Sequence, residues 1–267
     1  MIEIIRNHWQ RGRIRHAIFD FDGTLSLIRE GWQPIMIAVM VETLLQTPNR
    51  ESEPELRQMA ADLVARTTGH MTHYQMACLG DEVARRGGRP LDPPTYKQRF
   101  LDRLNGRIEQ RLAALSAGHS TPDDLMVPGA RAMLKALCAR GVQCYLVSGT
   151  DEPYVVKEAA ALHITSYFDS IHGAQPDPAR SAKKEFIHGL VAKHHLTESE
   201  FVSFGDGVAE IEEAARAGGI AVGVASNEAE RAGLDARKRR LLIQAGAHVI
   251  VPDFSKHAAL VRYLLSV

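Results

Sequence analysis

The spacing of apolar residues divides the chain into two kinds of predicted structure. A short apolar run, His16–Phe21, lies between basic residues and a glycine, which predicts a buried strand that ends in a loop. Between about residues 28 and 115 the apolar residues recur at helical spacing instead, as in the stripe of Met36, Met40 and Leu44. Breaker residues interrupt this region repeatedly, so we expect four or five helices there and no strand.

From Pro128 onward, helices and strands are predicted to alternate. The expected helices span 130–139, 154–162, 184–194, 211–217 and 237–245, and the expected strands span 143–147, 170–172, 201–204, 221–224 and 248–251. This alternation is typical of parallel strands with helices on both faces. Because the first strand belongs with them, we predict a doubly wound α/β core, residues 1–27 and 122–267, with an inserted all-helical domain, residues 28–121.

Composition and charge limit the classes of partner. The chain has 267 residues, 45% of them hydrophobic, which is enough to bury a full core. Lys+Arg and Asp+Glu number 32 each, so no net charge attracts nucleic acid or an anionic membrane, and we expect neither as a partner. We interpret the basic run Arg237–Arg240 as a solvated helix face.

Two further features bear on location. The N-terminal residues contain no apolar run as long as a signal peptide or a membrane span requires. Cys78, Cys138 and Cys144 lack metal-ligand spacing and favour free thiols in a reducing compartment. We therefore expect a cytoplasmic protein. As its oligomeric state we expect either a monomer or a homodimer.

Polar residues follow the predicted strands where the strands end. The relevant residues are Asp20 and Asp22, Ser148–Thr150, Lys183 or Lys184 in the loop before a helix, and Gly205–Asp206. Each group alone has a common structural explanation, namely a turn, a helix cap or a solvated lysine. Together they point to one site, because ligands of doubly wound folds bind beyond the carboxyl ends of the strands.

This set of side chains suits a metal ion and a phosphate. Carboxylates brought together raise one another's pKa unless a cation neutralises them. Mg²⁺ prefers oxygen ligands and commonly binds carboxylates together with a substrate phosphate, whereas Zn²⁺ would call for His and Cys. Backbone N–H groups of a glycine-containing loop and the Ser148 hydroxyl can hold phosphate oxygens. We therefore expect Mg²⁺ as the cofactor and a small phosphorylated molecule as the ligand.

The same residues resemble the motifs of the haloacid dehalogenase superfamily, and within it the phosphatases with a helical cap. The matching segments are DFDGT at Asp20–Thr24, the strand that ends in SGT at Ser148–Thr150, the lysine of SAKKEF, and GDGVAEI at Gly205–Ile211. These segments span nearly the whole chain. The resemblance implies a Rossmann-like core with a cap that covers the active site.

The resemblance also implies a role for each matching residue. Asp20 would be the nucleophile that forms an aspartyl-phosphate, Asp22 the general acid/base, and Lys183 the catalytic cation. The phosphate-binding residues would be Thr24, Ser148, Gly149, Thr150 and Lys184, and the metal ligands would be Asp20, Asp22 through its backbone carbonyl, Asp206 and Glu210.

Two positions depart from the family pattern or leave it ambiguous. Glu210 occupies a position that Asp often holds, so it would ligate the metal through water or orient Asp206. Lys183 and Lys184 are adjacent, and their spacing to the apolar pair Phe186 and Ile187 favours Lys183.

An acid at position 22 favours phosphate ester chemistry, because dehalogenases and phosphonatases of this superfamily lack one. We expect a phosphatase for a sugar phosphate or a phosphoglycolate-like compound. A phosphomutase of the β-phosphoglucomutase type is the first alternative, and a non-catalytic binding module is the second. The polar stretch Thr67–Gln75 is either a substrate-binding loop or an interhelical turn, and Glu30 and Trp32 lie at the expected hinge into the cap.

Overall fold

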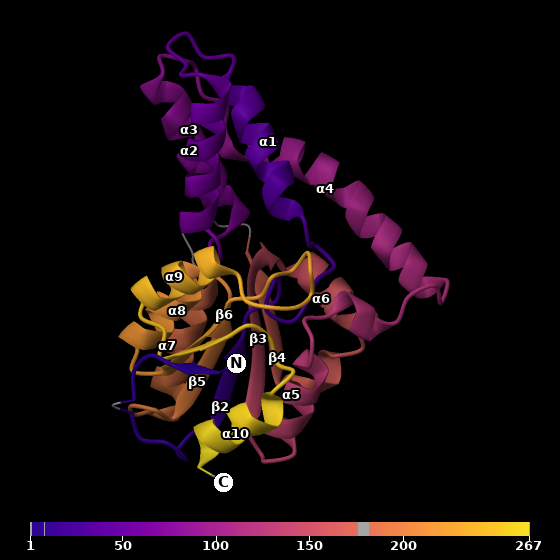
Figure 1. Cartoon of the computed structure of the whole chain (residues 1–267), viewed down its shortest axis with the longest axis vertical. Coiled ribbons are helices and arrows are strands. Elements are labelled where there is room, and N and C mark those ends of the chain that lie inside the picture. Colours follow the sequence, from indigo (N-terminus) through magenta and orange to yellow (C-terminus); the bar gives the residue numbers. More distant parts are fainter. Residues whose placement is uncertain (1, 8, 176–181, 267) are drawn as a thin grey trace.

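The computed structural model describes residues 2–7, 9–175 and 182–266 (Figure 1). Its described part contains a seven-stranded sheet with the order β1-β7-β6-β5-β2-β3-β4. The strands are β1 (Glu3–Ile4), β2 (His16–Phe19), β3 (Gln143–Asp151), β4 (Ser170–Ala174), β5 (Phe201–Gly205), β6 (Ile220–Val224) and β7 (Val249–Val251). All neighbours pair in parallel except β1, which adds an antiparallel edge to β7. The predicted doubly wound α/β fold is confirmed, although the two-residue β1 was not predicted.

Helices cover both faces of the sheet. They are α5 (Ala130–Cys138), α6 (Glu152–Ala161), α7 (Ala182–His194), α8 (Val208–Arg216), α9 (Ala236–Gln244) and α10 (His257–Leu265), of which α10 was not predicted. Helices α5, α6 and α10 pack on one face, and α7, α8 and α9 pack on the other. Strand β2 lies between them, with Ala17 and Phe19 in one cluster and Ile18 in the other. This burial on both faces explains why its sequence is continuously apolar.

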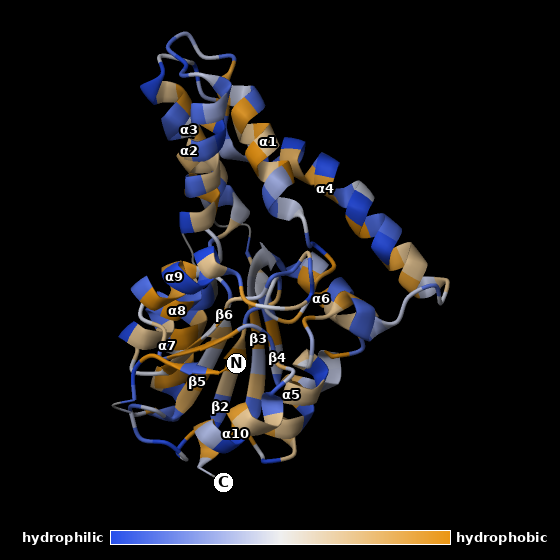
Figure 2. Ribbon diagram, in the orientation of Figure 1, coloured by the Kyte–Doolittle hydropathy of each residue, from blue (hydrophilic) through white to orange (hydrophobic). Residues whose placement is uncertain are grey.

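Four helices stand at one end of the sheet, above the point where β2 leads into them (Figure 1). They are α1 (Trp32–Leu44), α2 (Glu53–Arg66), α3 (Thr72–Arg85) and α4 (Pro93–Ser116), and a 3₁₀ turn, η1 (Pro122–Leu125), follows them. The predicted stripe of Met36, Met40 and Leu44 is buried among them. Figure 2 shows that α2, α3 and α4 mix apolar and polar residues, as helices with one solvated face do. The helical cap is therefore confirmed, and no strand interrupts residues 28–115, all of which the structure describes.

Local sequence fixes where the cap helices begin. Ser52 and Glu55 form a reciprocal capping box at the start of α2, in which the Glu55 carboxylate accepts a hydrogen bond from the Ser52 backbone N–H at 3.0 Å. At the start of α4, the Asp92 carboxylate accepts from the Thr95 N–H at 3.2 Å.

Two further features concern the described residues as a whole. None of the described helices combines the length and apolar character that crossing a bilayer requires. The three cysteines carry free thiols, and only Cys144 is fully buried.

Candidate active site

The carboxyl ends of three neighbouring strands deliver side chains to one pocket beneath the cap. Asp20 and Asp22 follow β2, Ser148–Thr150 belong to the end of β3, and Asp206 follows β5. Lys183 enters the same pocket from the first turn of α7. The structure thus brings together residues from all four segments that the sequence singled out. Lys184 is exposed at the next helical position, and neither it nor the fully buried Thr24 lines the pocket.

A glycine allows the β2 tip to approach β5. The Asp20 backbone N–H donates to the Phe204 carbonyl at 2.9 Å, which continues the pairing of the two strands. Gly23 then turns the chain with φ +74°, and a Cβ at this position would lie 2.3 Å from Asp206 Oδ2. Any other side chain would therefore meet both a strained backbone and a clash. The glycine of the DFDGT motif is what lets Asp20 and Asp206 share one site.

Three buried carboxylates meet at this edge. Oxygen atoms of Asp20, Asp206 and Glu210 all lie within 4.8 Å of one another. Burial raises the pKa of Asp20, and the Lys183 ammonium, 2.7 Å from its Oδ1, opposes that rise. Burial likewise raises the pKa of Asp206 to about 6. The cluster therefore holds ionised carboxylates only where a cation compensates for lost hydration.

Glu210 is occupied by protein donors on both oxygens. Its Oε2 accepts from Lys183 Nζ at 2.9 Å, and its Oε1 accepts from the Gly207 N–H at 2.6 Å, where α8 begins. Lys183 is thus held between Asp20 and Glu210. These contacts hold Lys183, and the two roles expected for Glu210, metal ligation through water and orientation of Asp206, stay predictions.

Asp22 lies in a different environment from Asp20. Its Oδ2 accepts a hydrogen bond from the Thr150 hydroxyl at 2.8 Å, while its buried Oδ1 has no hydrogen-bond partner in the described part of the chain. Burial raises the pKa of Asp22 to about 6. Thr150, expected to bind phosphate, thus contacts Asp22, and its backbone N–H donates to the Ser148 hydroxyl at 3.1 Å.

An arginine that the sequence did not single out lies beside Asp22. Arg29 Nε is 3.8 Å from Asp22 Oδ1, and the guanidinium bonds Glu158 of α6, with Nη2 2.6 Å from Oε1. Arg29 and Glu158 are both buried. Because they are 129 residues apart and neither belongs to a motif, no local pattern identified this pair.

The cap closes the pocket through backbone contacts with glycines. A Cβ at Gly149 would lie 2.9 Å from the His70 carbonyl oxygen, and one at Gly207 would lie 2.6 Å from the Thr68 carbonyl oxygen. A Cβ at Gly69 would lie 2.2 Å from Glu210 Oε2. The loop between α2 and α3 therefore rests directly on the ends of β3 and β5.

Part of the polar stretch at Thr67–Gln75 faces the pocket and part does not. Its pocket-lining members are Thr68, Gly69, His70, Thr72 and Gln75, whereas His73 and Tyr74 do not line it. Buried Gln75 donates to the Thr67 hydroxyl at 3.2 Å. Trp32 also lines the pocket, and Glu30 lines a neighbouring cavity.

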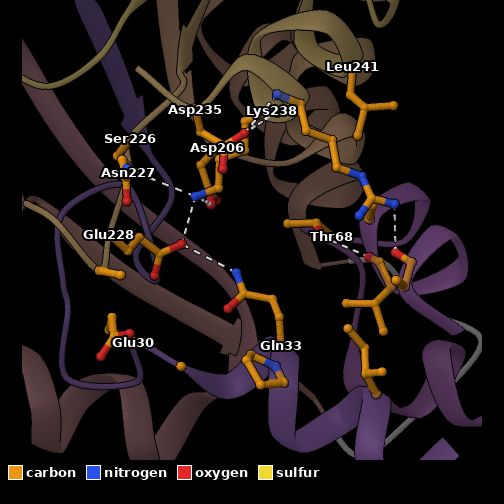
Figure 3. Close-up of a pocket in the computed structure, with 18 of the residues that line it drawn as sticks. Glu30, Gln33, Thr68, Asp206, Ser226, Asn227, Glu228, Asp235, Lys238 and Leu241 are labelled. Carbon is orange, nitrogen blue, oxygen red and sulfur yellow. Dashed lines mark hydrogen bonds and ion pairs between the residues drawn. The ribbon is translucent and has the colours of Figure 1, made fainter. Parts of the chain in front are cut away.

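That neighbouring cavity adjoins the acidic cluster at Asp206 (Figure 3). Lys238 of α9 reaches into it, with Nζ 2.7 Å from Asp206 Oδ2. The interpretation of Arg237–Arg240 as a solvated face is wrong for this lysine, whose side chain is 15% exposed. The sequence of four basic residues does not indicate which side chain is buried, because that depends on where α9 begins.

The donor chemistry of the cluster fits Mg²⁺. Asp20, Asp206 and Glu210 each offer a hard carboxylate oxygen, these oxygens lie within 4.8 Å of one another, and this group of potential ligands among the described residues contains neither His nor Cys. Burial disfavours these charges in isolation, so a bound divalent cation would stabilise them.

Residues 14–218 match the family model for haloacid dehalogenase-like hydrolases. No curated protein matches the chain. Similar solved structures include a predicted phosphoglycolate phosphatase from Haemophilus somnus 129pt, at 20% identity and a TM-score of 0.59, with 93% of this chain and 98% of that chain covered. A putative β-phosphoglucomutase from Bacteroides vulgatus has 14% identity and a TM-score of 0.60, covering 97% and 93%. A phosphonoacetaldehyde hydrolase-like protein from Oleispira antarctica has 16% identity and a TM-score of 0.60, covering 99% and 98%. At these identities the structures share the fold with this chain.

Proposed function

Because the chain belongs to the haloacid dehalogenase-like hydrolases, we propose that it is a Mg²⁺-dependent phosphatase that acts on a small phosphorylated metabolite. The observation that carries the proposal is the contrast between two neighbouring carboxyl groups. Asp20 pairs with the Lys183 ammonium at 2.7 Å, whereas Asp22 accepts from the Thr150 hydroxyl, has the Arg29 guanidinium only at 3.8 Å, and has a pKa of about 6. Two carboxyls with different environments suit two different catalytic roles.

In the first step, Asp20 attacks phosphorus. A bond forms between an Asp20 carboxylate oxygen and the phosphorus atom while the bond to the leaving oxygen breaks, which gives an aspartyl-phosphate. Asp22, as the acid, donates its proton to the leaving oxygen. Its pKa of about 6 keeps part of the population protonated near neutral pH.

In the second step, water attacks the phosphoryl group. Asp22, now ionised, accepts the proton of the water, and the bond to Asp20 breaks to release inorganic phosphate. Thr150 keeps the Asp22 carboxylate in place through its hydroxyl. Lys183 and Ser148 neutralise and hold the phosphoryl oxygens, so positioning and electrostatics supply most of the rate.

Three groups would hold Mg²⁺ in this account: the side chains of Asp20 and Asp206 and the backbone carbonyl of Asp22. The ion, when bound, supplies positive charge that allows an anionic nucleophile to approach an anionic phosphate. Glu210 would hold Lys183, since its Oε2 accepts from that ammonium, and its carboxylate lies close enough to Asp20 and Asp206 to reach the ion through a water molecule.

The walls of the pocket limit the substrate. Its lining includes the apolar residues Trp32, Met36, Phe100 and Leu104 and the polar residue Gln75. A sugar phosphate or a phosphoglycolate-like compound remains the leading class, since a small leaving group with hydroxyl or carboxyl groups can use the polar lining. We also predict a cytoplasmic location, and a monomer or a homodimer as the oligomeric state.

Phosphate release from a substrate panel tests this function. The panel should contain sugar phosphates, phosphoglycolate and p-nitrophenyl phosphate, each assayed with Mg²⁺ and with EDTA, for the wild type and for Asp20→Asn. We expect Mg²⁺-dependent release that Asp20→Asn abolishes. Absence of release from every phosphomonoester, or equal release by Asp20→Asn, would overturn the proposal.

A phosphomutase is the second candidate, because a cap loop that rests on Gly149 and Gly207 shields the site from water, as transfer between two hydroxyls requires. Analysis of the products separates the two. An isomerised sugar phosphate with little free phosphate indicates a mutase, and stoichiometric inorganic phosphate indicates a phosphatase.

A further inference from the structure

Lys238 is a lysine held between two buried carboxylates. Its Nζ lies 2.7 Å from Asp206 Oδ2 and 2.7 Å from Glu228 Oε1. The side chains of Asp206 and Glu228 are 4% and 8% exposed. Figure 3 shows the ammonium group between the two carboxylates at the wall of the cavity. This lysine has no part in the catalytic steps described above.

The surrounding structure fixes Lys238 in this position. Asp235 caps α9, and its carboxylate accepts from the N–H groups of Arg237 at 2.8 Å and of Lys238 at 2.9 Å. The Arg237 side chain pairs instead with Asp62 of α2, with its Nη2 2.6 Å from Asp62 Oδ1. The start of α9 is therefore anchored at its cap and against α2, and the lysine is not a mobile surface group.

Glu228 offers the ammonium a second partner next to Asp206. Its Oε1 also accepts from the Gln33 side-chain amide of α1 at 3.3 Å, which orients the carboxylate toward the cavity. A cation bound to Asp206 would lie close to the Lys238 ammonium, and the two positive charges would repel each other in this buried environment. Glu228 can retain the lysine when Asp206 binds another cation.

We propose that Lys238 is an internal counter-ion that competes with the divalent ion for Asp206 and so weakens metal binding, with Glu228 retaining the ammonium when the metal is bound. The proposal rests on the proposed function only in that Asp206 is a metal ligand. It gives Lys238 a role in setting metal affinity, distinct from that of Lys183, which lies on the far side of the acidic cluster beside Asp20 and Glu210.

Calorimetric titration of the full chain with MgCl₂ tests the proposal. The Lys238→Met variant, which keeps an unbranched side chain one atom shorter and removes its charge, should bind Mg²⁺ about tenfold more tightly than the wild type, because one nearby positive charge is gone. Arg240→Met is the matched control: it removes one charge from an exposed position of the same helix and should leave the Kd within about twofold.

Glu228→Gln provides a second, opposite readout. Without Glu228 the ammonium loses one of its two carboxylate partners and keeps Asp206 and the Ser226 hydroxyl, which is 3.4 Å away, so this variant should bind Mg²⁺ about tenfold more weakly than the wild type. The loss should be smaller when Glu228→Gln is introduced into Lys238→Met, because the competing ammonium is then absent. An equal loss in both backgrounds would show that Glu228 acts only through its charge, and would overturn its role as a second partner for the lysine.

Thermal unfolding supplies a readout that needs neither activity nor calorimetry. In EDTA, Lys238→Met should melt at a lower temperature than the wild type, because Asp206 and Glu228 lose their shared cation. Added Mg²⁺ should then raise its melting temperature by more than that of the wild type.

Two results would contradict this account, and they are distinguishable. If the wild type binds Mg²⁺ and Lys238→Met binds it equally or more weakly, the lysine serves only to orient Asp206, and the competition is overturned while the proposed metal site stands. If neither protein binds Mg²⁺, the metal site fails, and both proposals fail with it.

Discussion

Asp22 illustrates how contacts give one of two neighbouring carboxyl groups an environment of its own. It is two positions from Asp20, yet it bonds Thr150 and lies near Arg29, whereas Asp20 bonds Lys183. The sequence predicted that the two carboxylates would share one site, because both follow the same strand. It did not predict what distinguishes them, since the distinguishing partners come from β3 and from the segment that leads into α1.

We predict that Asp22→Asn lowers turnover of an alkyl phosphate by about a hundredfold or more, because neither the leaving oxygen nor the attacking water then has a proton-transfer partner. Steady-state kinetics on the best substrate of the panel measure this effect. Asp123→Asn, at an exposed residue of η1, is the matched control and should keep wild-type turnover. Activity of Asp22→Asn within about threefold of the wild type would remove Asp22 from the mechanism.

The Arg29–Glu158 pair gives a prediction for stability. We expect Glu158→Gln to lower the free energy of unfolding by about 3 kcal/mol, because it leaves a buried guanidinium without its closest counter-ion. Urea unfolding measures the change. Glu53→Gln breaks an exposed ion pair with Arg57 and should cost less than about 0.5 kcal/mol, so similar losses in the two variants would contradict this account.

At the scale of elements, the ends of strands and the loop between α2 and α3 build the pocket together. The parallel pairing of β2 with β3 and β5 puts three carboxyl ends at one edge, which is why residues far apart in the sequence could be predicted to meet. The packing of the cap loop on those ends was beyond prediction, since it depends on close approach between backbones at Gly149 and Gly207.

Gly69 allows a test of this packing. It has φ +89°, and a Cβ there would lie 2.2 Å from Glu210 Oε2, so Gly69→Ala should displace the loop and lower kcat/KM by about a hundredfold. Gly118→Ala is the matched control, because Gly118 has φ +72° and a Cβ there would have no neighbouring atom within 4 Å. It should lose about 1 kcal/mol of stability through backbone strain and keep full activity. Equal activity of the two variants would show that the loop does not shape the site.

The whole molecule is a sheet-based core with a helical cap fastened to it at several points. Lys97 Nζ of α4 lies 2.7 Å from Asp151 Oδ2 at the end of β3, and Arg237 Nη2 of α9 lies 2.6 Å from Asp62 Oδ1 of α2. Hydrophobic periodicity predicted both parts and the insertion of one into the other. It missed β1, which is too short to show a period, and it missed the ion pairs between cap and core, because a charged residue in the sequence gives no indication of its partner.

The central claim is that Asp20 carries the phosphoryl group during turnover. Peptide mapping by mass spectrometry of enzyme quenched in acid while it turns over its best substrate tests this most directly. The account predicts one phosphoryl group on the peptide that contains Asp20, present with Mg²⁺ and absent with EDTA or in Asp20→Asn. Phosphate release by Asp20→Asn at the wild-type rate, with no phosphorylated Asp20 in the wild type, would contradict it.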